Sequence, residues 1–276
     1  MAEFEPIECK CCGGEAVFRG TVDFNRSCVD RFGERAFPVS DVLIPYWICT
    51  RCGFIFTNHM DTWSAEDFRQ KIYNDDYVLA DPPVFGMSNV PPRETPGYEH
   101  GKLIAALLNG SQDKITILDF GSGGNPGPTG LALRDNHFNV VSYDAYRADI
   151  SDPPDRVFDV IVAIEVFEHC HDLEDLKNFM ERYLSPNGII WISTVLHVFP
   201  APPDILESWY IAPRNGHISI FSFIALAALF RSVGINIVQT MHGVIGFKDM
   251  PNFENQILVK PIAAKARGKF LGIFGK

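Results

Sequence analysis

The pattern of apolar and polar positions changes near residue 98, where strand-like and helix-like stretches begin to alternate. Residues 158–164 are apolar on both faces, which is typical of a strand inside a parallel sheet. Elsewhere apolar residues recur at helical spacing, as Leu173, Leu176 and Met180 do. This alternation predicts an α/β fold, with a mostly parallel sheet and helices on both faces. The predicted helices cover residues 98–108, 129–136, 172–184 and 222–233, and the predicted strands cover residues 115–120, 139–143, 158–164, 189–193, 235–241 and 256–260.

The first 97 residues follow a different pattern. Short apolar segments before residue 60 predict the strands of a small, separate domain. Five prolines between residues 82 and 96 forbid regular structure there and predict a loop or lid. We therefore divide the chain into a ribbon-like domain at 1–60, a proline-rich linker or lid at 61–97, an α/β domain at 98–260 and a tail at 261–276.

Composition places the chain among ordinary globular proteins and restricts its partners. Of 276 residues, 46% are apolar and 21% are charged. The net charge of −10 argues against binding to nucleic-acid phosphates. The longest apolar run, residues 223–230, is too short to span a bilayer, which takes about 20 apolar residues, and the N-terminus lacks the features of a signal peptide. We expect a cytoplasmic protein with no nucleic-acid partner and no stable membrane association.

The cysteines gather near the N-terminus and repeat one motif. The pattern C-x-x-C-G occurs at residues 9–13 and again at residues 49–53, and its spacing lets two thiolates point at one tetrahedral ion. Two such motifs predict a zinc ribbon with a closed, structural site. A disulfide framework is disfavoured because nothing marks the chain as secreted, and a redox dithiol needs only one motif. The predicted zinc ligands are Cys9, Cys12, Cys49 and Cys52, with Cys11 and Cys28 as spares and the choice among Cys9, Cys11 and Cys12 left open.

A glycine-rich loop follows the first predicted strand of the α/β domain. Residues 119–124 have the form D-x-G-x-G-G, which lets the backbone approach a ligand closely while the next helix offers N–H donors. Asp144 ends the following strand, where an acidic side chain is placed to accept both hydroxyls of a ribose. Together these features predict a cofactor that carries ribose and adenine. A dinucleotide is disfavoured, because Pro126 and Pro128 remove N–H donors that a pyrophosphate would use.

These motifs, with three further stretches, resemble the class I S-adenosylmethionine-dependent methyltransferases from about residue 98 to residue 260. The stretches begin at Phe158 (FDVIVAIEVFEH), at Leu184 (LSPNGIIWIS) and at His217 (HISIFS). The resemblance implies a Rossmann-like fold, S-adenosylmethionine as cofactor and methyl transfer as activity. The 13 residues between Asp144 and Phe158 are too few for the helix and strand that the family has there, so the adenine contact stays open around residues 148–150. The cofactor contacts that the resemblance implies are Asp119, Gly121, Ser122, Gly123, Gly124, Asp144, Ala145 and Glu165.

The N-terminal motifs point to one group within this class of methyltransferases. A zinc ribbon followed by Ile72, Tyr73 and Tyr77 ahead of the core is similar to bacterial methyltransferases that act on sugars and natural-product intermediates. The sugar C-methyltransferases of that group carry a further C-terminal domain that this sequence does not contain, which leaves O- and N-methylation open beside C-methylation. We expect a small-molecule acceptor. The alternatives are an RNA or protein methyltransferase that docks its substrate through the ribbon, and a non-catalytic scaffold that binds the cofactor. The oligomeric state stays open.

An acidic and histidine-containing motif lies at the carboxyl end of the strand at 158–164, where α/β sheets place ligands. Glu165 lies one turn before Glu168 and His169, and His217 can approach from a later loop. A histidine suits proton removal at neutral pH, so Glu168, His169 and His217 are the candidate catalytic residues. Quinone O-methyltransferases and small-RNA 2′-O-methyltransferases hold a divalent ion with a similar constellation, so a second metal site at these four positions is an alternative, as is a structural role. Candidate walls of the acceptor pocket are Tyr73, Tyr77, Tyr98, His197, Trp209 and Tyr210.

The tail at 261–276 interleaves basic side chains with apolar ones on an otherwise acidic chain. Amphipathic segments of this kind can lie on an anionic membrane. Glycines at positions 268, 272 and 275 weaken any helix there, and a few charges attract a membrane only marginally without a lipid chain. We therefore expect that the tail does not anchor the protein.

Overall fold

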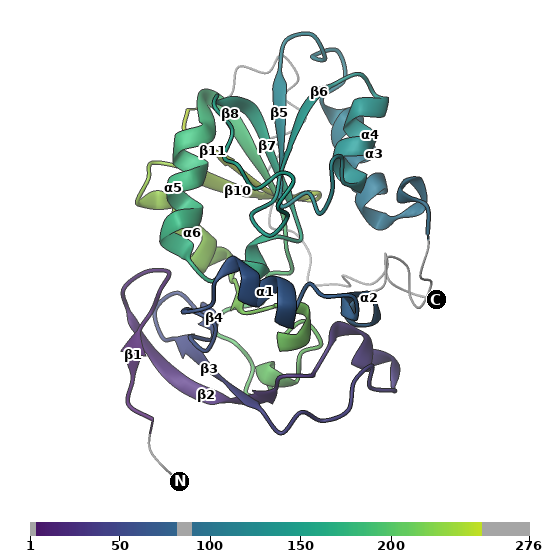
Figure 1. The fold of residues 1–276 in the computed structure, drawn as a ribbon. Helices are drawn as coiled ribbons and strands as arrows, with labels where there is room; N and C mark the ends of the chain where they lie inside the picture. The colour runs from purple at the N-terminus through teal and green to yellow at the C-terminus, as the bar shows by residue number, and fades with distance from the viewer. Residues whose placement is uncertain (1–3, 82–89, 250–276) are drawn as a thin grey trace.

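The larger of two sheets forms the centre of the α/β domain. The computed structural model describes residues 4–81 and 90–249 (Figure 1). Its large sheet has the order β10-β11-β8-β7-β5-β6, in which the last four strands are parallel and the first two are antiparallel to their neighbours. This mostly parallel sheet confirms the predicted fold class. The strands are β5 (Thr116–Phe120), β6 (Asn139–Tyr143), β7 (Phe158–Ile164), β8 (Leu184–Ser193), β10 (Asn236–Thr240) and β11 (Gly243–Phe247).

Helices cover both faces of this sheet, α3 and α4 on one side and α5 and α6 on the other (Figure 1). Three of them begin at a polar side chain that accepts a backbone N–H, namely Thr95, Asp172 and Ser222. The four predicted helices are present, with ends shifted by a few residues. In the described parts of the chain, no helix is long and apolar enough to cross a bilayer. The bounds are α3 (Pro96–Leu107), α4 (Pro128–Asp135), α5 (Leu173–Tyr183) and α6 (Phe223–Arg231).

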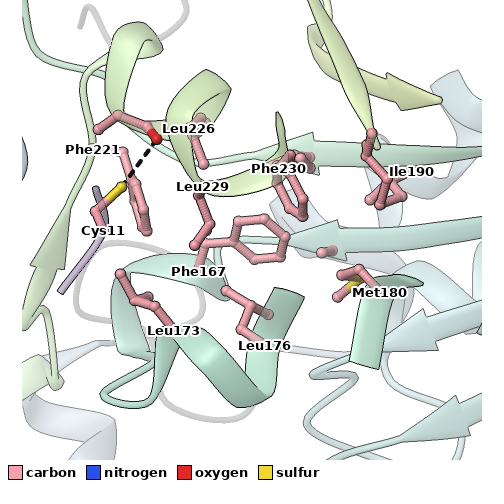
Figure 2. Close-up of a cluster of buried hydrophobic side chains, with 14 of the residues drawn as sticks. Cys11, Phe167, Leu173, Leu176, Met180, Ile190, Phe221, Leu226, Leu229 and Phe230 are labelled. Carbon is pink, nitrogen blue, oxygen red and sulfur yellow. Dashed lines mark hydrogen bonds between the residues drawn. The ribbon is translucent and has the colours of Figure 1, made fainter. Parts of the chain in front are cut away.

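Successive residues of the central strands face opposite sides of the sheet and build two cores. In β7, Val160 and Val162 pack with α3 and α4, whereas Ile161 and Ala163 pack with α5 and α6. A strand covered on both faces needs apolar residues at consecutive positions, which explains the continuous run in the sequence. Figure 2 shows part of the second core, where Leu173, Leu176 and Met180 of α5 meet Leu226, Leu229 and Phe230 of α6 near Phe167.

The smaller sheet consists of N-terminal strands and one strand from the C-terminal half. Its order is β1-β2-β3-β4-β9, and all its pairs are antiparallel. Strand β9 joins β4 by pairing Ile220 with Ile55 and Ser219 with Phe56. The ribbon is therefore completed by a segment far along the chain. Its strands are β1 (Ile7–Glu8), β2 (Glu15–Asp23), β3 (Leu43–Cys49), β4 (Ile55–Phe56) and β9 (Ser219–Ile220).

The cysteine motifs of the ribbon pack directly on α6. The Cys11 thiol donates a hydrogen bond to the Ala225 carbonyl at 3.0 Å (Figure 2), and Ser222 Oγ donates to the Cys52 carbonyl at 2.6 Å. Cys9, Cys11, Cys49 and Cys52 belong to the same buried cluster as the side chains of α5 and α6. The ribbon and the α/β domain thus share one core.

Short helices connect these parts. Helices α1 (Ala65–Lys71) and α2 (Tyr77–Ala80) lie between the small sheet and the large one (Figure 1). Helix α1 begins at Ser64, whose side chain accepts the N–H of Asp67. The 3-10 helices are η1 (Cys28–Phe32), η2 (Pro92–Glu94), η3 (Phe167–His169), η4 (Ile205–Glu207) and η5 (Pro213–Asn215).

Some local predictions were wrong. Residues 92–96 were predicted to be irregular, but Pro92 begins η2 and Pro96 begins α3, where the missing N–H of proline costs no helical hydrogen bond. The strand predicted at 189–193 begins earlier, because β8 starts at Leu184, beside a register irregularity between Phe158 and Val160. Strand β11 was not predicted. The predicted strand at 256–260 and the tail at 261–276 lie outside the described residues.

Candidate active site and metal centre

Four thiols of the two cysteine motifs meet at one end of the ribbon. The sulfur atoms of Cys9, Cys12, Cys49 and Cys52 all lie within 4.8 Å of one another. Those of Cys9 and Cys52 are 3.8 Å apart, those of Cys12 and Cys49 are 3.5 Å apart, and all four cysteines are free. A tetrahedral zinc ion with bonds of about 2.3 Å separates its sulfur ligands by about 3.8 Å. The spacing therefore fits such an ion.

The surroundings of these thiols also suit a cation. Burial by itself raises the pKa of the Cys49 thiol, but the N–H groups of Cys52 and Arg51, each 3.4 Å from its sulfur, lower the pKa below the ordinary value. The hydrogen bond with Cys52 and then burial raise the pKa of Cys9 far above its ordinary value. A divalent ion favours the thiolate form and relieves this cost. Cys11 and Cys28 lie outside the group.

The glycine-rich loop turns sharply after β5, beside the end of β6. Gly121 and Gly123 have φ angles of 68° and 64°, a region that favours glycine. A side chain at Gly121 would meet Val166 at 2.6 Å, whereas the space beside Gly123 is open. The Asp144 carboxylate accepts the N–H of Gly123 and the N–H of Tyr146, each at 2.9 Å. Asp144 therefore fixes the loop while its side chain remains partly accessible.

Asp119 lies at the end of β5, beneath the loop. It is 3% exposed and accepts the N–H of Gly130 in α4 at 3.0 Å. Burial raises the pKa of Asp119 to about 7, although the Gly130 N–H works in the opposite direction. A side chain at Gly130 would come within 2.6 Å of this carboxylate. Asp119 thus links the strand to the helix, behind the loop. Ser122 Oγ donates to the Gly124 carbonyl at 2.9 Å, and Ala145 is exposed.

Two carboxyl groups after β7 share the hydroxyl of Tyr210. This oxygen lies 2.5 Å from Glu168 Oε1 and 3.1 Å from Glu165 Oε2. Thr194, directly after β8, donates to the other Glu168 oxygen at 2.9 Å. Glu168 is fully buried, whereas Glu165 keeps a solvent-accessible edge although protein atoms surround it on most sides. Burial, and then the charge of Glu168, raise the pKa of Glu165, and burial also raises the pKa of Glu168.

The backbone of Glu165 has a φ angle of 52°, which is unusual for a residue other than glycine. Its side chain is held there by Ser193 Oγ, which donates to Oε1 at 3.0 Å. Such strain is commonly found at functional sites. The strained residue lies at the carboxyl end of β7, beside the loop that follows β5.

His169 and His217 bring their rings to a centroid distance of 4.8 Å, next to Glu168. His217 Nδ1 lies 2.8 Å from the carbonyl oxygen of Tyr210, which assigns the hydrogen to Nδ1 and leaves a lone pair on Nε2. Burial lowers the pKa of both histidines, so His217 is neutral at pH 7. His169 Nδ1 is buried without a hydrogen-bond partner among the described residues. The pair therefore offers nitrogen lone pairs to a proton or a cation.

A row of aromatic rings continues from the histidines toward α2. Tyr73 lies 6.1 Å from His169 and 5.2 Å from Tyr77 between ring centroids. Tyr146, from the loop after Asp144, packs against Tyr73 in a tilted arrangement, with ring centroids 5.1 Å apart. Tyr73 and Tyr77 belong to the 61–97 segment, so this row brings two of the predicted walls of the acceptor pocket beside the candidate catalytic residues.

The structure separates other residues that the sequence grouped together. Tyr98 donates to Asp135 of α4 at 2.8 Å, and both ring nitrogens of His197 face backbone carbonyls of Gly53 and Val198. Sequence reasoning missed Thr194 and Tyr146, and treated Tyr210 only as a pocket wall. Thr194 follows β8, the neighbour of β7, so its place at a strand end was a usable signal.

Comparison with known proteins gives one family. A family profile described as "Methyltransferase domain" matches residues 94–240. Two curated relatives are the ubiquinone biosynthesis O-methyltransferases of Rickettsia akari and Rickettsia typhi, each 28% identical, with alignments that cover 41% and 38% of this chain and 55% and 52% of the relatives. The chain thus spans about half the length of the curated relatives it matches. A solved structure, the 1,6-didemethyltoxoflavin N1-methyltransferase of Burkholderia thailandensis, is 15% identical with a TM-score of 0.42, over 66% of this chain and 84% of that one.

Proposed function

Because the chain belongs to the family of methyltransferase domains, we propose that it transfers a methyl group from S-adenosylmethionine to a small-molecule acceptor. The acceptor class that we propose is a sugar or a natural-product intermediate, methylated on oxygen, nitrogen or carbon. The observation that carries this proposal is the convergence of three strand ends. Asp144 after β6 braces the glycine loop after β5, and Glu165 opens to solvent after β7.

The residues present suit this cofactor. The open space beside Gly123 leaves room for a ligand against the backbone, and Asp144 offers a carboxylate to ribose hydroxyls. Ser122, Gly124 and Ala145 complete the loop side, and Glu165 follows β7, the strand that pairs with β5. S-adenosylmethionine supplies a methyl group already activated by the positive charge on sulfur. The protein then has to place the acceptor in line with that methyl group and exclude competing water.

Removal of the acceptor proton is the second task. We assign it to His217, which keeps a lone pair on Nε2 and lies beside His169 and Glu168. A neutral imidazole is the form that can take a proton, and burial favours that form here. Glu168 and Tyr210 form a hydrogen-bonded support behind the histidines. Tyr73 and Tyr77 then form a wall for the acceptor.

A divalent ion at the same place is a second candidate role. Ligand atoms of Glu168, His169 and His217 lie within 4.8 Å of one another, and Glu165 reaches the same network through Tyr210. An ion there would lower the pKa of an acceptor hydroxyl. Metal analysis after mild chelation separates this role from that of the histidine base.

We also propose a structural zinc ion at Cys9, Cys12, Cys49 and Cys52. An ion held by four thiolates keeps a net negative charge. The hollow beside the thiols is lined by more basic than acidic side chains, so its net positive charge offsets that of the site. The basic residues are Lys10, Arg51, Lys177 and Arg231, and the acidic ones are Glu8 and Glu174. The division into a ribbon at 1–60, a lid at 61–97 and a methyltransferase domain at 98–260 remains our proposal for the functional units.

The proposed function is tested by incubating the protein with methyl-labelled S-adenosylmethionine and small-molecule extracts, followed by mass spectrometry. We expect labelled products in which a methyl group replaces a hydrogen. Label in RNA or protein but in no small molecule would instead support a docking role for the ribbon. Cofactor binding without any transfer would support a non-catalytic scaffold. Either result would contradict the proposed function.

A further inference from the structure

The ribbon touches the candidate site at His217. The Tyr46 hydroxyl donates a hydrogen bond to the backbone carbonyl of His217 at 2.9 Å, and Tyr46 lies in the middle of β3. Tyr46 is 0% exposed, so this bond is shielded from bulk water. Burial also raises the pKa of Tyr46 well above its ordinary value, which keeps the hydroxyl protonated and able to donate.

The residues after His217 are held between the ribbon and η3. On one side, the Thr57 N–H donates to the Ile218 carbonyl at 3.2 Å, and β9 pairs with β4. On the other side, the Ile218 N–H donates to the Glu168 carbonyl at 2.9 Å, and Ser219 Oγ donates to the Cys170 carbonyl at 2.6 Å. Residues 217–220 therefore bridge the ribbon and the segment that carries Glu168 and His169.

The orientation of the His217 ring depends on this backbone. Nδ1 reaches the Tyr210 carbonyl at 2.8 Å, and the His217 N–H donates to the Ala212 carbonyl at 3.2 Å. Tyr46 restrains the third polar group of the residue, its carbonyl. The Nδ1 contact sets the tautomer, and the two backbone bonds hold the residue from which the ring projects.

We propose that Tyr46 is a positioning residue, which fixes the His217 carbonyl and thereby presents the Nε2 lone pair to the acceptor. This inference rests on the proposed function, in which His217 takes the acceptor proton. The ribbon then builds part of the acceptor site. In this proposal the ribbon acts on a catalytic residue of the same molecule and does not recruit a separate partner.

The test compares Tyr46→Phe with Tyr98→Phe in the full-length protein. The first change removes the hydroxyl but keeps the buried ring. The control removes a tyrosine hydroxyl that bonds to Asp135, away from His217. Nitrogen-15 spectra of labelled histidine report the tautomer, with His217→Gln used to assign the signals. We expect the His217 signals of Tyr46→Phe to show a tautomer mixture, while zinc content and cofactor Kd stay within twofold of wild type. The control should leave the spectrum unchanged.

Three outcomes are distinguishable. Unchanged His217 signals in a folded Tyr46→Phe protein overturn the inference and leave the proposed function intact. A wild-type protein that binds no S-adenosylmethionine overturns the proposed function, whatever the spectra show. A Tyr46→Phe protein that does not fold, beside a folded Tyr98→Phe control, would assign Tyr46 to the stability of the fold and would also overturn the inference. With an acceptor in hand, Tyr46→Phe should lower kcat at least fivefold without raising the KM for the cofactor.

Discussion

Asp119, Glu165 and Glu168 are carboxyl groups that the fold partly or fully withdraws from water at the ends of β5 and β7. Their local motifs could be predicted from sequence, because a glycine loop after a strand and a Glu-x-x-Glu-His run are contiguous. The partners that hold them could not. Tyr210 follows Glu168 by 42 residues, and no periodicity indicates that its hydroxyl lies between two carboxyl groups. Such contacts depend on how loops cross above the sheet.

Asp144→Ala should weaken S-adenosylmethionine binding more than tenfold. Hydrogen bonds to a charged group contribute about 1.5–3 kcal/mol each, and the ribose would lose such an acceptor. The loop would also lose the brace on Gly123. Isothermal titration calorimetry measures the change, with Asp113→Ala as control, since Asp113 is exposed before the start of β5, at the end of the strand opposite the loop. Equal affinities for wild type and Asp144→Ala would refute the assignment of Asp144 to the cofactor.

Asp119 should make the protein less stable as pH rises from about 4 to about 7. Its pKa is about 7 in the folded state against 3.8 ordinarily, so the folded state binds this proton more tightly than the unfolded chain does. Roughly three pKa units correspond to at most about 4 kcal/mol. Asp119→Asn keeps an oxygen for the Gly130 N–H and should flatten this dependence.

The measurement for Asp119 is urea unfolding at pH 5 and pH 8 for wild type, Asp119→Asn and an exposed control, Asp155→Asn. The wild type and the control should lose stability between these pH values by more than Asp119→Asn does. The same pH dependence in all three proteins would contradict the assigned pKa.

At the level of helices and strands, elements with a continuous sequence pattern could be predicted well. Elements that depend on pairing with a distant segment could not. Helix α5 follows from its apolar spacing and its cap at Asp172, and β7 follows from its doubly apolar run. The pairing of the cysteine motifs at residues 9–13 and 49–53 could be predicted because the same motif occurs twice. Strand β9 has two residues and exists because it completes the edge of the ribbon beside β4. No signal within two residues can predict such a partner.

The ribbon should contain about one zinc ion per chain. Cys49→Ser should lose the ion and unfold the ribbon, because a closed site contributes its binding energy to folding. Cys170→Ser should keep the ion, since Cys170 lies outside the thiol group. Metal analysis of reduced, purified protein measures the stoichiometry. Wild-type protein without zinc would show that the four thiols serve another purpose.

Considered as a whole, the molecule has no clean boundary between ribbon and α/β domain within its described residues. Trp47 and the buried cysteines share a cluster with Phe221 and Leu226. Composition and motif spacing indicated two units, but the shared core depends on side chains more than 100 residues apart and could not be inferred from either unit alone.

Because of this shared core, zinc release and unfolding of the large sheet should coincide. A chelating dye reports release of the ion, and circular dichroism reports loss of the helices, both during one urea titration. We expect the same midpoint from both signals, as for a single cooperative unit. Zinc release at clearly lower urea, with the helices intact, would mean that the ribbon opens independently.

The pairing of β4 with β9 has a consequence for the nascent chain. Ile55 meets Ile220, so 165 residues must leave the ribosome before the ribbon's last partner arrives. At about 5–20 residues per second, this takes roughly 8–33 s. Throughout that time β4 is an open sheet edge, which other unfinished chains can join. The four thiols have emerged long before then, so the zinc ion that we propose has time to bind before the sheet is complete. Production of this protein in cells should therefore depend on free zinc and on chaperones that shield the waiting strand.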